Sequence, residues 1–554
     1  MCDMTAATNR WVSRLAAVAG LFLAALPAVL LPAAPASAHA VLVSTSPVLD
    51  SVLPNAPAEV VLTFSESVRE VPDRVRVIAP DGQRVDQGEP VFDGAVVIIT
   101  VDQQSSRGTY LVSYRVISAD GHPVSGGFTY SVGAPSAVPT DESAGADTDP
   151  VVSTLVQVAK FFGYAGLMLI VGPALVLSML WPRRLSRTGA GRVAWTGLGV
   201  LAAATVAGIW LQAPYVTGGG LTDVDGAALR DVLGSGLGAA LLVRLGVLAA
   251  AAVLLRPFLA GADGRSDRIL LGVLAVVGTF TWPLAGHPSA SPVPAVSVVV
   301  DSAHLAGMAV WLGGLVMLAV FLLPRADERE LGAILPIWSR WAALAVCTLL
   351  LAGTVQALIE VGTLEALIST TYGRLLLTKI SLFVVVLAVA AYSRQLVRNR
   401  TAAGRPGRVR QAVIAELAVT VVVLAVTSVL VQTTPARTAI GEDLRATSGY
   451  FSATLTSDIY SLQVEVDPSR RGNNSVHLYA YTPENRPQPV IEWQATAALP
   501  AEGVEPIEIP LLPLTDNHAT GEISLPTAGD WELRITVRIS DIDQATVSTT
   551  VEIN

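Results

Sequence analysis

The sequence predicts a multi-domain membrane protein with three folded parts: a secreted β-sandwich or β-barrel, an eight-helix transmembrane bundle and a C-terminal β-sandwich. Hydrophobic residues fill 52% of the 554 positions and charged residues only 15%, a balance typical of a membrane protein that also carries soluble mass. Apolar runs of about 20 residues, the length that crosses a bilayer, recur through the middle of the chain. Segments rich in β-branched and aromatic residues flank that region, which predicts two β-domains.

Residues 1–38 have the layout of a secretory signal peptide. Arg10 and Arg14 precede a long apolar run, and small residues follow up to Ala38. Cleavage after Ala38 makes His39 the first residue, which then offers its α-amine and a ring nitrogen to one metal ion. Copper(II) favours such nitrogen-rich, tetragonal sites. The alternative is that His39 follows the cut by accident, so a copper interpretation needs a second group of ligands.

Residues 39–133 predict a small β-sandwich or β-barrel, because short strand-like segments alternate with turn clusters. Residues 134–153 are rich in Pro, Ser, Gly and Asp, cannot bury a core and predict a linker. The strand-like segments read AEVVLTFSE, RVRVIAP, AVVIITV, GTYLVSYRVIS and GGFTYSVG.

Residues 154–433 predict a bundle of eight transmembrane helices. Along the chain, four Arg-rich loops between helices alternate with Arg-poor loops. The positive-inside rule puts the Arg-rich loops in the cytoplasm. With an even number of helices, both soluble domains then lie on the extracytoplasmic side of the cell membrane. The expected spans are 154–181, 193–213, 234–255, 269–286, 296–323, 338–359, 374–393 and 411–433.

Residues 434–554 predict a second, extracytoplasmic β-sandwich, from segments such as YSLQVEVDP, SVHLYAYTP and GDWELRITVRIS. Cysteines occur only as Cys2 and Cys347, so no disulfide is expected in the mature chain. The net charge of −9 and the scarcity of lysine argue against nucleic acid as a partner.

The chain has six histidines, and His122 lies two residues after Asp120 in SADGHPVSGG. In an extended segment, alternate side chains point to the same side, so this carboxylate and imidazole can reach one ion, with His39 completing the set. Two nitrogen donors and a carboxylate suit copper(II) and tolerate zinc. The alternative is that Asp120 forms a turn, which the sequence D-G-H-P favours, and that His122 is a surface residue.

The stretches HAVLVSTSPVLDSVLPNAPAEVVLTFSESV and YRVISADGHPVSGGFTYSVG resemble the CopC family of periplasmic copper-binding β-barrels over nearly all of residues 39–133. The resemblance implies that His39, Asp120 and His122 hold copper(II). It also implies that Glu66, in the matching F-S-E stretch, supports these ligands from outside the coordination sphere. No methionine lies between His39 and the first membrane helix, so the copper(I) loop of some family members is not expected.

The fifth expected span carries a second group of ligand types. Asp301, His304 and Met308 recur at spacings of three and four, so they share one face of a helix. Imidazole and thioether together suit copper, above all copper(I), and His287 lies at the outer end of the fourth span. Ionisable residues inside a span are expensive to bury and are functional candidates. The alternative is that His304 bonds a neighbouring helix and Met308 only packs.

The stretches DSAHLAGMAVWLGGL and TTYGRLLLTKISL resemble the CopD family of copper-resistance and copper-uptake membrane proteins, over the eight-helix region. The resemblance implies that His287, His304 and Met308 are ligands on a copper pathway. Both lysines of the chain, Lys160 and Lys379, lie within expected spans, where they either snorkel to the interface or take part in transport.

The last domain resembles the YtkA-type β-sandwich through DNHATGEISLPTAGDWELRITV. His477 and His518 lie in it and are weak metal candidates, because exposed histidines on β-domains are usually just solvated. Arg244 and Glu416 in the membrane region are weaker candidates than the two lysines, and snorkelling to the interface is the favoured interpretation for them.

These features predict a copper-handling protein of the lipid bilayer that captures copper(II) outside the cell. The protein is expected to transport copper inward, with copper as the cargo. Sequestration for copper resistance, or sensing without transport, are alternatives built on the same residues. The protein is not expected to be an enzyme; a copper oxygenase built on His39 is the less favoured rival, because the Asp120 carboxylate takes a coordination position that oxygen would need. An external copper chaperone or reductase is a candidate partner.

Overall fold

The computed structural model describes residues 40–49, 51–53, 55–102, 106–139, 148–262, 264–398, 406–439, 451–482, 487–540 and 542–553. The chain forms two compact units. One contains the membrane helices together with the short segment Ile117–Pro123, and the other contains the rest of the two β-domains. His39 and the expected signal peptide lie outside the described residues.

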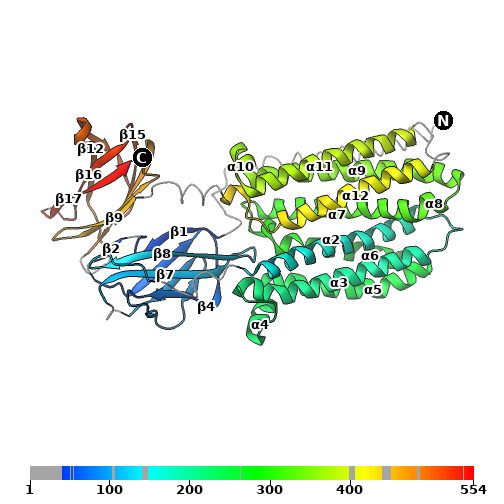
Figure 1. The fold of residues 1–554 in the computed structure, drawn as a ribbon, viewed down its shortest axis with the longest axis horizontal. Coiled ribbons are helices and arrows are strands. Elements are labelled where there is room, and N and C mark those ends of the chain that lie inside the picture. The colour runs from blue at the N-terminus through cyan, green and yellow to red at the C-terminus, as the bar shows by residue number, and fades with distance from the viewer. Residues whose placement is uncertain are drawn as a thin grey trace. The chain divides into compact units, whose positions relative to one another are not determined.

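The N-terminal β-domain has its described strands in two sheets, with orders β1-β3-β6-β5 and β2-β8-β7-β4 (Figure 1). The alternation in β3 shows why the sequence forms strands here, since Val60, Leu62 and Phe64 are buried while Glu59 is exposed. The predicted β-rich domain is therefore confirmed. Its strands are β1 (Leu42–Ser46), β2 (Val52–Leu53), β3 (Glu59–Phe64), β4 (Arg69–Ile78), β5 (Val91–Asp93), β6 (Val96–Thr100), β7 (Gly108–Ile117) and β8 (Pro123–Val132).

Eight helical spans in the described part of the chain are long and apolar enough to cross a membrane, as the sequence predicts. Each overlaps one expected span. The ends differ by at most five residues, except that the sixth span begins ten residues earlier than expected, at Glu328. They are Pro150–Met179, Thr188–Thr217, Gly236–Ala260, Arg265–Ala285, Pro294–Arg325, Glu328–Val361, Thr371–Gln395 and Pro406–Leu430. The helices within them are α2 (Pro150–Met179), α3 (Thr188–Thr217), α5 (Gly236–Ala260), α6 (Arg265–Phe280), α7 (Pro294–Met317), α8 (Leu323–Arg325), α9 (Glu328–Val361), α11 (Thr371–Arg398) and α12 (Pro406–Leu430).

Two connections at one end of the bundle contain short helices that sequence analysis treated as loops, namely α4 (Gly226–Gly234) and α10 (Leu364–Ser369). The side chain of Asp225 accepts the backbone N–H of Ala228 at 2.7 Å, and Thr363 caps α10 in the same manner. Side-chain caps of this kind satisfy free N–H groups and start a helix.

The fourth span ends in irregular backbone. After α6, the chain forms two short turns, η1 (Pro283–Ala285) and η2 (His287–Ala290), before α7 begins. Pro283 begins the first turn and Pro288 is the second residue of the other, and proline lacks the N–H that a continuing α-helix needs. His287 therefore begins a short 3-10 turn and is not part of an α-helix.

Helices α2 and α7 pack backbone to backbone at a pair of glycines. A Cβ atom built on Gly172 would lie 2.3 Å from the carbonyl carbon of Gly313, and one on Gly313 would lie 2.4 Å from the carbonyl oxygen of Met168. Small residues permit such close helix contacts where no hydrophobic effect drives the helices together. The central helix α7 is thereby held against α2, which fixes the face that carries His304.

The C-terminal β-domain has its described strands in two further sheets, with orders β14-β15-β11-β10-β9 and β13-β12-β16-β17. Its core contains Trp531, which is fully buried. The predicted β-fold is confirmed, and β12 to β14 are added to the segments that the sequence indicated. The strands are β9 (Phe451–Thr456), β10 (Ser461–Asp467), β11 (Gly472–Tyr481), β12 (Glu492–Leu499), β13 (Val504–Ile509), β14 (Leu511–Thr515), β15 (His518–Leu525), β16 (Gly529–Arg538) and β17 (Gln544–Ile553).

Candidate metal site

The turn between β7 and β8 carries the Asp120 and His122 pair. Gly121 has φ +86° and donates its N–H to the Ser118 carbonyl at 3.0 Å, while the Ser118 N–H bonds the His122 carbonyl at 2.9 Å. Positive φ is a conformation that glycine adopts without strain. The pair therefore lies in a tight turn and not in the extended segment assumed from the sequence, and the turn itself brings the two side chains together.

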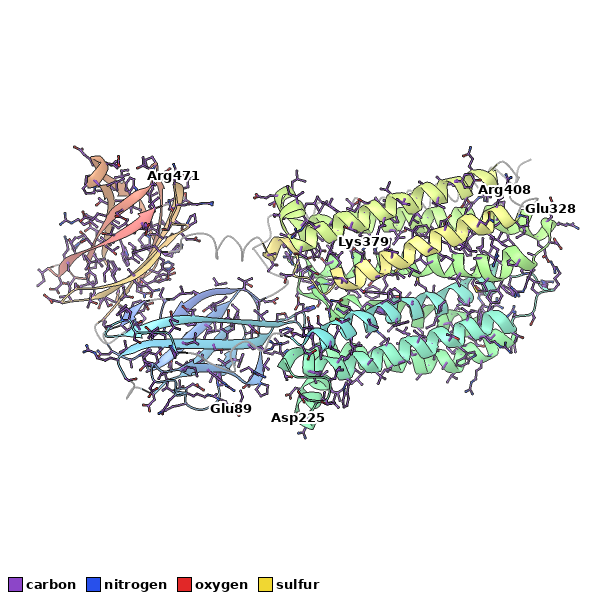
Figure 2. The ribbon with its side chains drawn as sticks, viewed as in Figure 1. Glu89, Asp225, Glu328, Lys379, Arg408 and Arg471 are labelled. Carbon is purple, nitrogen blue, oxygen red and sulfur yellow. The ribbon has the colours of Figure 1, made fainter. Side chains whose placement is uncertain are left out.

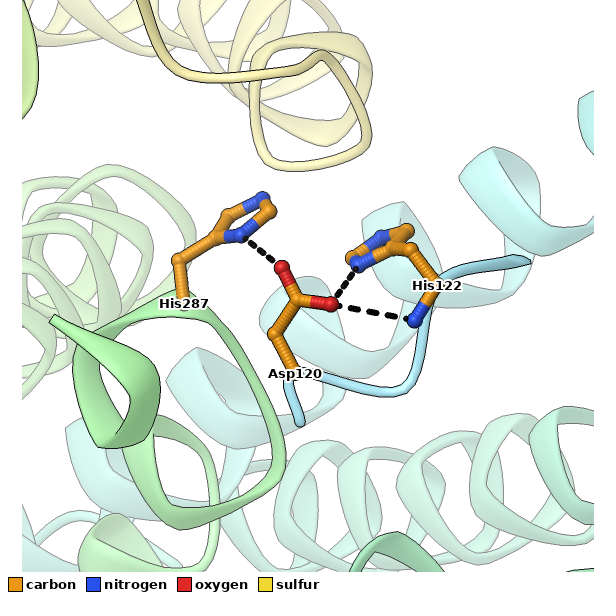
Figure 3. Close-up of side chains that lie close together, drawn as sticks. All are labelled: Asp120, His122 and His287. Carbon is orange, nitrogen blue, oxygen red and sulfur yellow. Dashed lines mark hydrogen bonds and ion pairs between the residues drawn. The ribbon is translucent and has the colours of Figure 1, made fainter. Parts of the chain in front are cut away.

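Asp120, His122 and His287 form one buried cluster within the helical unit (Figure 3). Asp120 Oδ2 lies 2.7 Å from His287 Nδ1, and Asp120 Oδ1 lies 3.1 Å from His122 Nδ1. The two imidazole rings stack with their centroids 4.8 Å apart. One ligand atom from each residue lies within 4.8 Å of the others, a spacing from which three side chains can converge on one ion.

Sequence analysis assigned His287 to the membrane pathway and not to the Asp120 pair. The structure joins it to that pair across 167 residues of sequence. His287 was recognisable as a candidate from its position at the outer end of a span. No feature of the neighbouring sequence indicated that its partner is Asp120.

Gln432 contacts His122, and Lys160 in turn contacts Gln432. Gln432 Oε1 lies 2.7 Å from His122 Nε2 and accepts a hydrogen bond from Lys160 Nζ, also at 2.7 Å. Metal-binding histidines usually donate their second ring N–H to an oxygen acceptor, which fixes the tautomer and the ring orientation. The contact to Gln432 leaves Nδ1 of His122 facing Asp120. Lys160 is thus directed toward this cluster, and sequence reasoning missed Gln432.

A cavity of about 850 Å³ extends from this cluster between the helices. It is lined by the four residues that the sequence indicated as a copper pathway, namely His287, Asp301, His304 and Met308. Asp120, His122 and the two lysines, Lys160 and Lys379, line it as well.

The α7 candidates lie deeper in the bundle. His304 is ten residues beyond Pro294, the start of α7, which at 1.5 Å per residue corresponds to about 15 Å, near the middle of an apolar layer about 30 Å thick. Met308 follows one turn later on the same face. Asp301 accepts a hydrogen bond from Gln356. Lys379 on α11, which Figure 2 labels, lines the same cavity.

The weaker membrane candidates have structural partners. Arg244 donates to the Thr281 hydroxyl at 2.9 Å and its guanidinium lies 3.9 Å from the Trp282 ring centroid. Glu416 accepts a hydrogen bond from Ser393 at 2.8 Å. Glu66 lies just after β3, in the other compact unit.

The two histidines of the C-terminal domain also meet. His477 Nδ1 on β11 lies 3.2 Å from His518 Nε2 on β15. Burial, and secondly the nearby His477, lower the pKa of His518. The sequence indicated both histidines as weak metal candidates but did not indicate that they lie side by side.

Comparison with known proteins follows the same division of the chain. Residues 42–133 match the CopC domain, residues 149–295 the N-terminal domain of copper resistance protein D-like proteins, and residues 332–430 copper resistance protein D. The CopC match contains the Asp120 and His122 pair, and the match at 149–295 contains His287.

Two curated relatives and one solved structure are similar to parts of this chain. The chain is 26% identical over 393 residues to the copper transport protein CutJ of Bacillus subtilis (strain 168), covering 66% of this chain and 70% of the relative. It is 34% identical over 110 residues to copper resistance protein C of Xanthomonas campestris pv. juglandis, covering 18% of this chain and 86% of the relative. The crystal structure of CopC from Methylosinus trichosporium OB3b has 25% identity, covers 18% of this chain and 97% of its own, and aligns with a TM-score of 0.16.

The fold and the site define a multi-pass membrane protein in which metal-ligand side chains line a cavity between the helices. The chain belongs to the CopC–CopD family of copper resistance and copper transport proteins, as its sequence resemblance predicts.

Proposed function

We propose that this protein binds copper(II) at the cluster of Asp120, His122 and His287 and passes copper inward through the bundle cavity. The observation that carries this proposal is the cavity itself, which is lined by the cluster and by His304 and Met308. The similar protein of Bacillus subtilis is named a copper transport protein, which supports transport as the activity.

The donor set of the cluster fits copper(II). Two imidazole nitrogens and one carboxylate oxygen are the ligand types that copper(II) accepts in tetragonal sites. Both Nδ1 atoms face the Asp120 carboxylate, so the three side chains converge on one place. His39, whose α-amine would add a further nitrogen donor, lies outside the described residues and remains a predicted ligand.

The deeper part of the cavity supplies softer ligands. His304 and Met308, four residues apart on one face of α7, pair an imidazole with a thioether, which suits copper more than the hard cations magnesium or calcium. A second ligand group at mid-bundle depth gives the ion a place to move to after it leaves Asp120.

The inward direction is supported by the distribution of arginine. The cluster lies at the bundle end that includes the Arg-poor connections before α5, α7 and α11, and the Arg-rich connections are at the opposite end. The positive-inside rule makes the cluster end extracytoplasmic, where copper from outside is captured. Copper is then cargo, and the proposed role is that of a carrier and not of an enzyme.

Copper entry into proteoliposomes tests the proposal. We expect the His304→Ala chain to load an enclosed copper probe at least about ten-fold more slowly than the intact chain, because even an outer partner of a metal ligand is worth about 10- to 100-fold in affinity. Met308→Leu should also slow loading. Met317→Leu is the matched control, because Met317 lies on the same helix but packs in the apolar core.

Equal loading by the intact and His304→Ala chains would remove α7 from the pathway. No loading above that of empty liposomes, with copper still bound to the purified protein, would instead favour sequestration or sensing. In cells, inward transport raises copper content on expression of the chain, whereas a resistance role by export lowers it.

A further inference from the structure

The outer face of the C-terminal sheet β14-β15-β11-β10-β9 gathers side chains that bind metals. Even-numbered residues of β11 from Val476 to Ala480 are fully buried, so His477 and Tyr479 point to the outer face. His518 on β15 is paired directly with Tyr479, and Glu465 on β10 is paired directly with His477. Three neighbouring strands therefore place two imidazoles and one carboxylate on one face.

The distance between the histidines is that of two ligands on one ion. His477 Nδ1 and His518 Nε2 are 3.2 Å apart. Two nitrogens that each lie about 2.0–2.1 Å from one ion are separated by about 2.9–3.4 Å when their angle lies between square and tetrahedral values. The same separation permits a hydrogen bond between neutral rings, so the neighbouring residues must decide between the two interpretations.

Those neighbours hold each group in position. The ring of Tyr479 stacks on His518 with centroids 4.1 Å apart, and the Ser475 hydroxyl lies 3.2 Å from His477 Nε2. Gln463 donates to Glu465 Oε1 at 2.7 Å. Partners that orient the imidazoles are the usual support of a metal site.

The third ligand, Glu465, lies directly opposite His477 on the neighbouring strand. Its carboxylate bonds Gln463 in the structure. Directly opposed residues on antiparallel strands have Cβ atoms about 4.5–5.5 Å apart, so a change of side-chain rotamer brings this carboxylate to an ion held by the two histidines. Two imidazoles and a carboxylate match both copper(II) and zinc(II). The site is half-buried on an outer sheet face, so an ion can enter it from solvent.

We propose that His477, His518 and Glu465 form a second metal site, in the C-terminal domain, that takes a copper(II) or zinc(II) ion. This site is separate from the Asp120 cluster and does not depend on the proposed transport pathway.

Metal counting on the full-length protein in detergent tests this inference. After removal of metals with a chelator, the chain is loaded with copper(II) or, separately, zinc(II), desalted and analysed for bound metal per chain. We expect His477→Gln and His518→Gln each to lose one equivalent, and Glu465→Gln to hold that equivalent at least ten-fold more weakly. Electron paramagnetic resonance of the copper(II) form should lose one nitrogen-coordinated signal in both histidine variants.

The matched control is Thr520→Ala, because Thr520 is paired with His477 on the same face and is not a proposed ligand. The combined Asp120→Ala and His122→Ala chain should keep the equivalent that belongs to the C-terminal domain. Unchanged stoichiometry and spectra in both histidine variants would show that the pair is only hydrogen-bonded and overturn the site. Loss of the equivalent in Thr520→Ala would overturn it as well, since the loss would then not be specific to ligands. The zinc(II) and copper(II) arms identify which ion the site retains after desalting.

Discussion

A residue that is not itself a metal ligand can still determine how a ligand is oriented, and Gln432 is the clearest case. Its side-chain oxygen accepts from Lys160 and contacts His122 Nε2, each at 2.7 Å. It contributes no ligand atom to the proposed site. It directs the second ring nitrogen of His122 toward Asp120, and by the rule for outer partners of metal ligands it should matter for affinity.

Replacing Gln432 with leucine removes this acceptor. We expect Gln432→Leu to weaken copper(II) binding by about 10- to 100-fold, measured on the full-length protein by competition with a chelator of known affinity. Gln432→Glu keeps an acceptor oxygen at the same position and should restore most of the binding. A Gln432→Leu chain with the affinity of the intact protein would rule out a positioning role for this residue.

At the scale of elements, the membrane helices are recognisable from their apolar runs, but their contacts depend on small residues. Gly172 of α2 and Gly313 of α7 face each other so closely that neither can carry a side chain without moving a helix. Helix α7 carries His304 and Met308, so the closeness of this contact also decides where the deep part of the cavity lies.

Gly172→Ala tests the contact between α2 and α7. We expect the free energy of unfolding to fall by about 1–3 kcal/mol, the usual cost of overpacking an interior, and the thermal denaturation midpoint in detergent to fall with it. Gly199→Ala on α3 is the control, because a Cβ there meets nothing within 4 Å and alanine favours helix formation. Equal midpoints for the two variants would mean that the helices separate at little cost.

At the scale of the whole molecule, function depends on which bundle end faces outward. Figure 2 labels Glu328 and Arg408 at one end of the bundle and Asp225 at the other. Asp225 caps α4 in an Arg-poor connection, whereas Glu328 begins α9 beside the arginine-rich turns. The proposed inward transport requires the Asp225 end to be extracytoplasmic.

Cysteine labelling in right-side-out membrane vesicles measures this orientation. In a Cys347→Ser background, we expect Asp225→Cys to react with a membrane-impermeant maleimide in intact vesicles. Glu328→Cys should react only after the vesicles are opened, because positive residues favour the cytoplasmic side. The reverse pattern would place the Asp120 cluster in the cytoplasm and contradict capture from outside.

The sequence alone determined the class of the molecule, its eight spans and its two β-regions, because apolar length and alternation are local properties that each segment carries. It also indicated two groups of neighbouring metal ligands, Asp120 with His122 and Asp301 with His304 and Met308. Residues that are close in sequence share a turn or a helix face, so each group could be found locally. Only the tertiary structure joined His287 to Asp120, and His477 to His518. Those pairs lie 167 and 41 residues apart, and their meeting depends on helix packing and strand register, which no local pattern encodes.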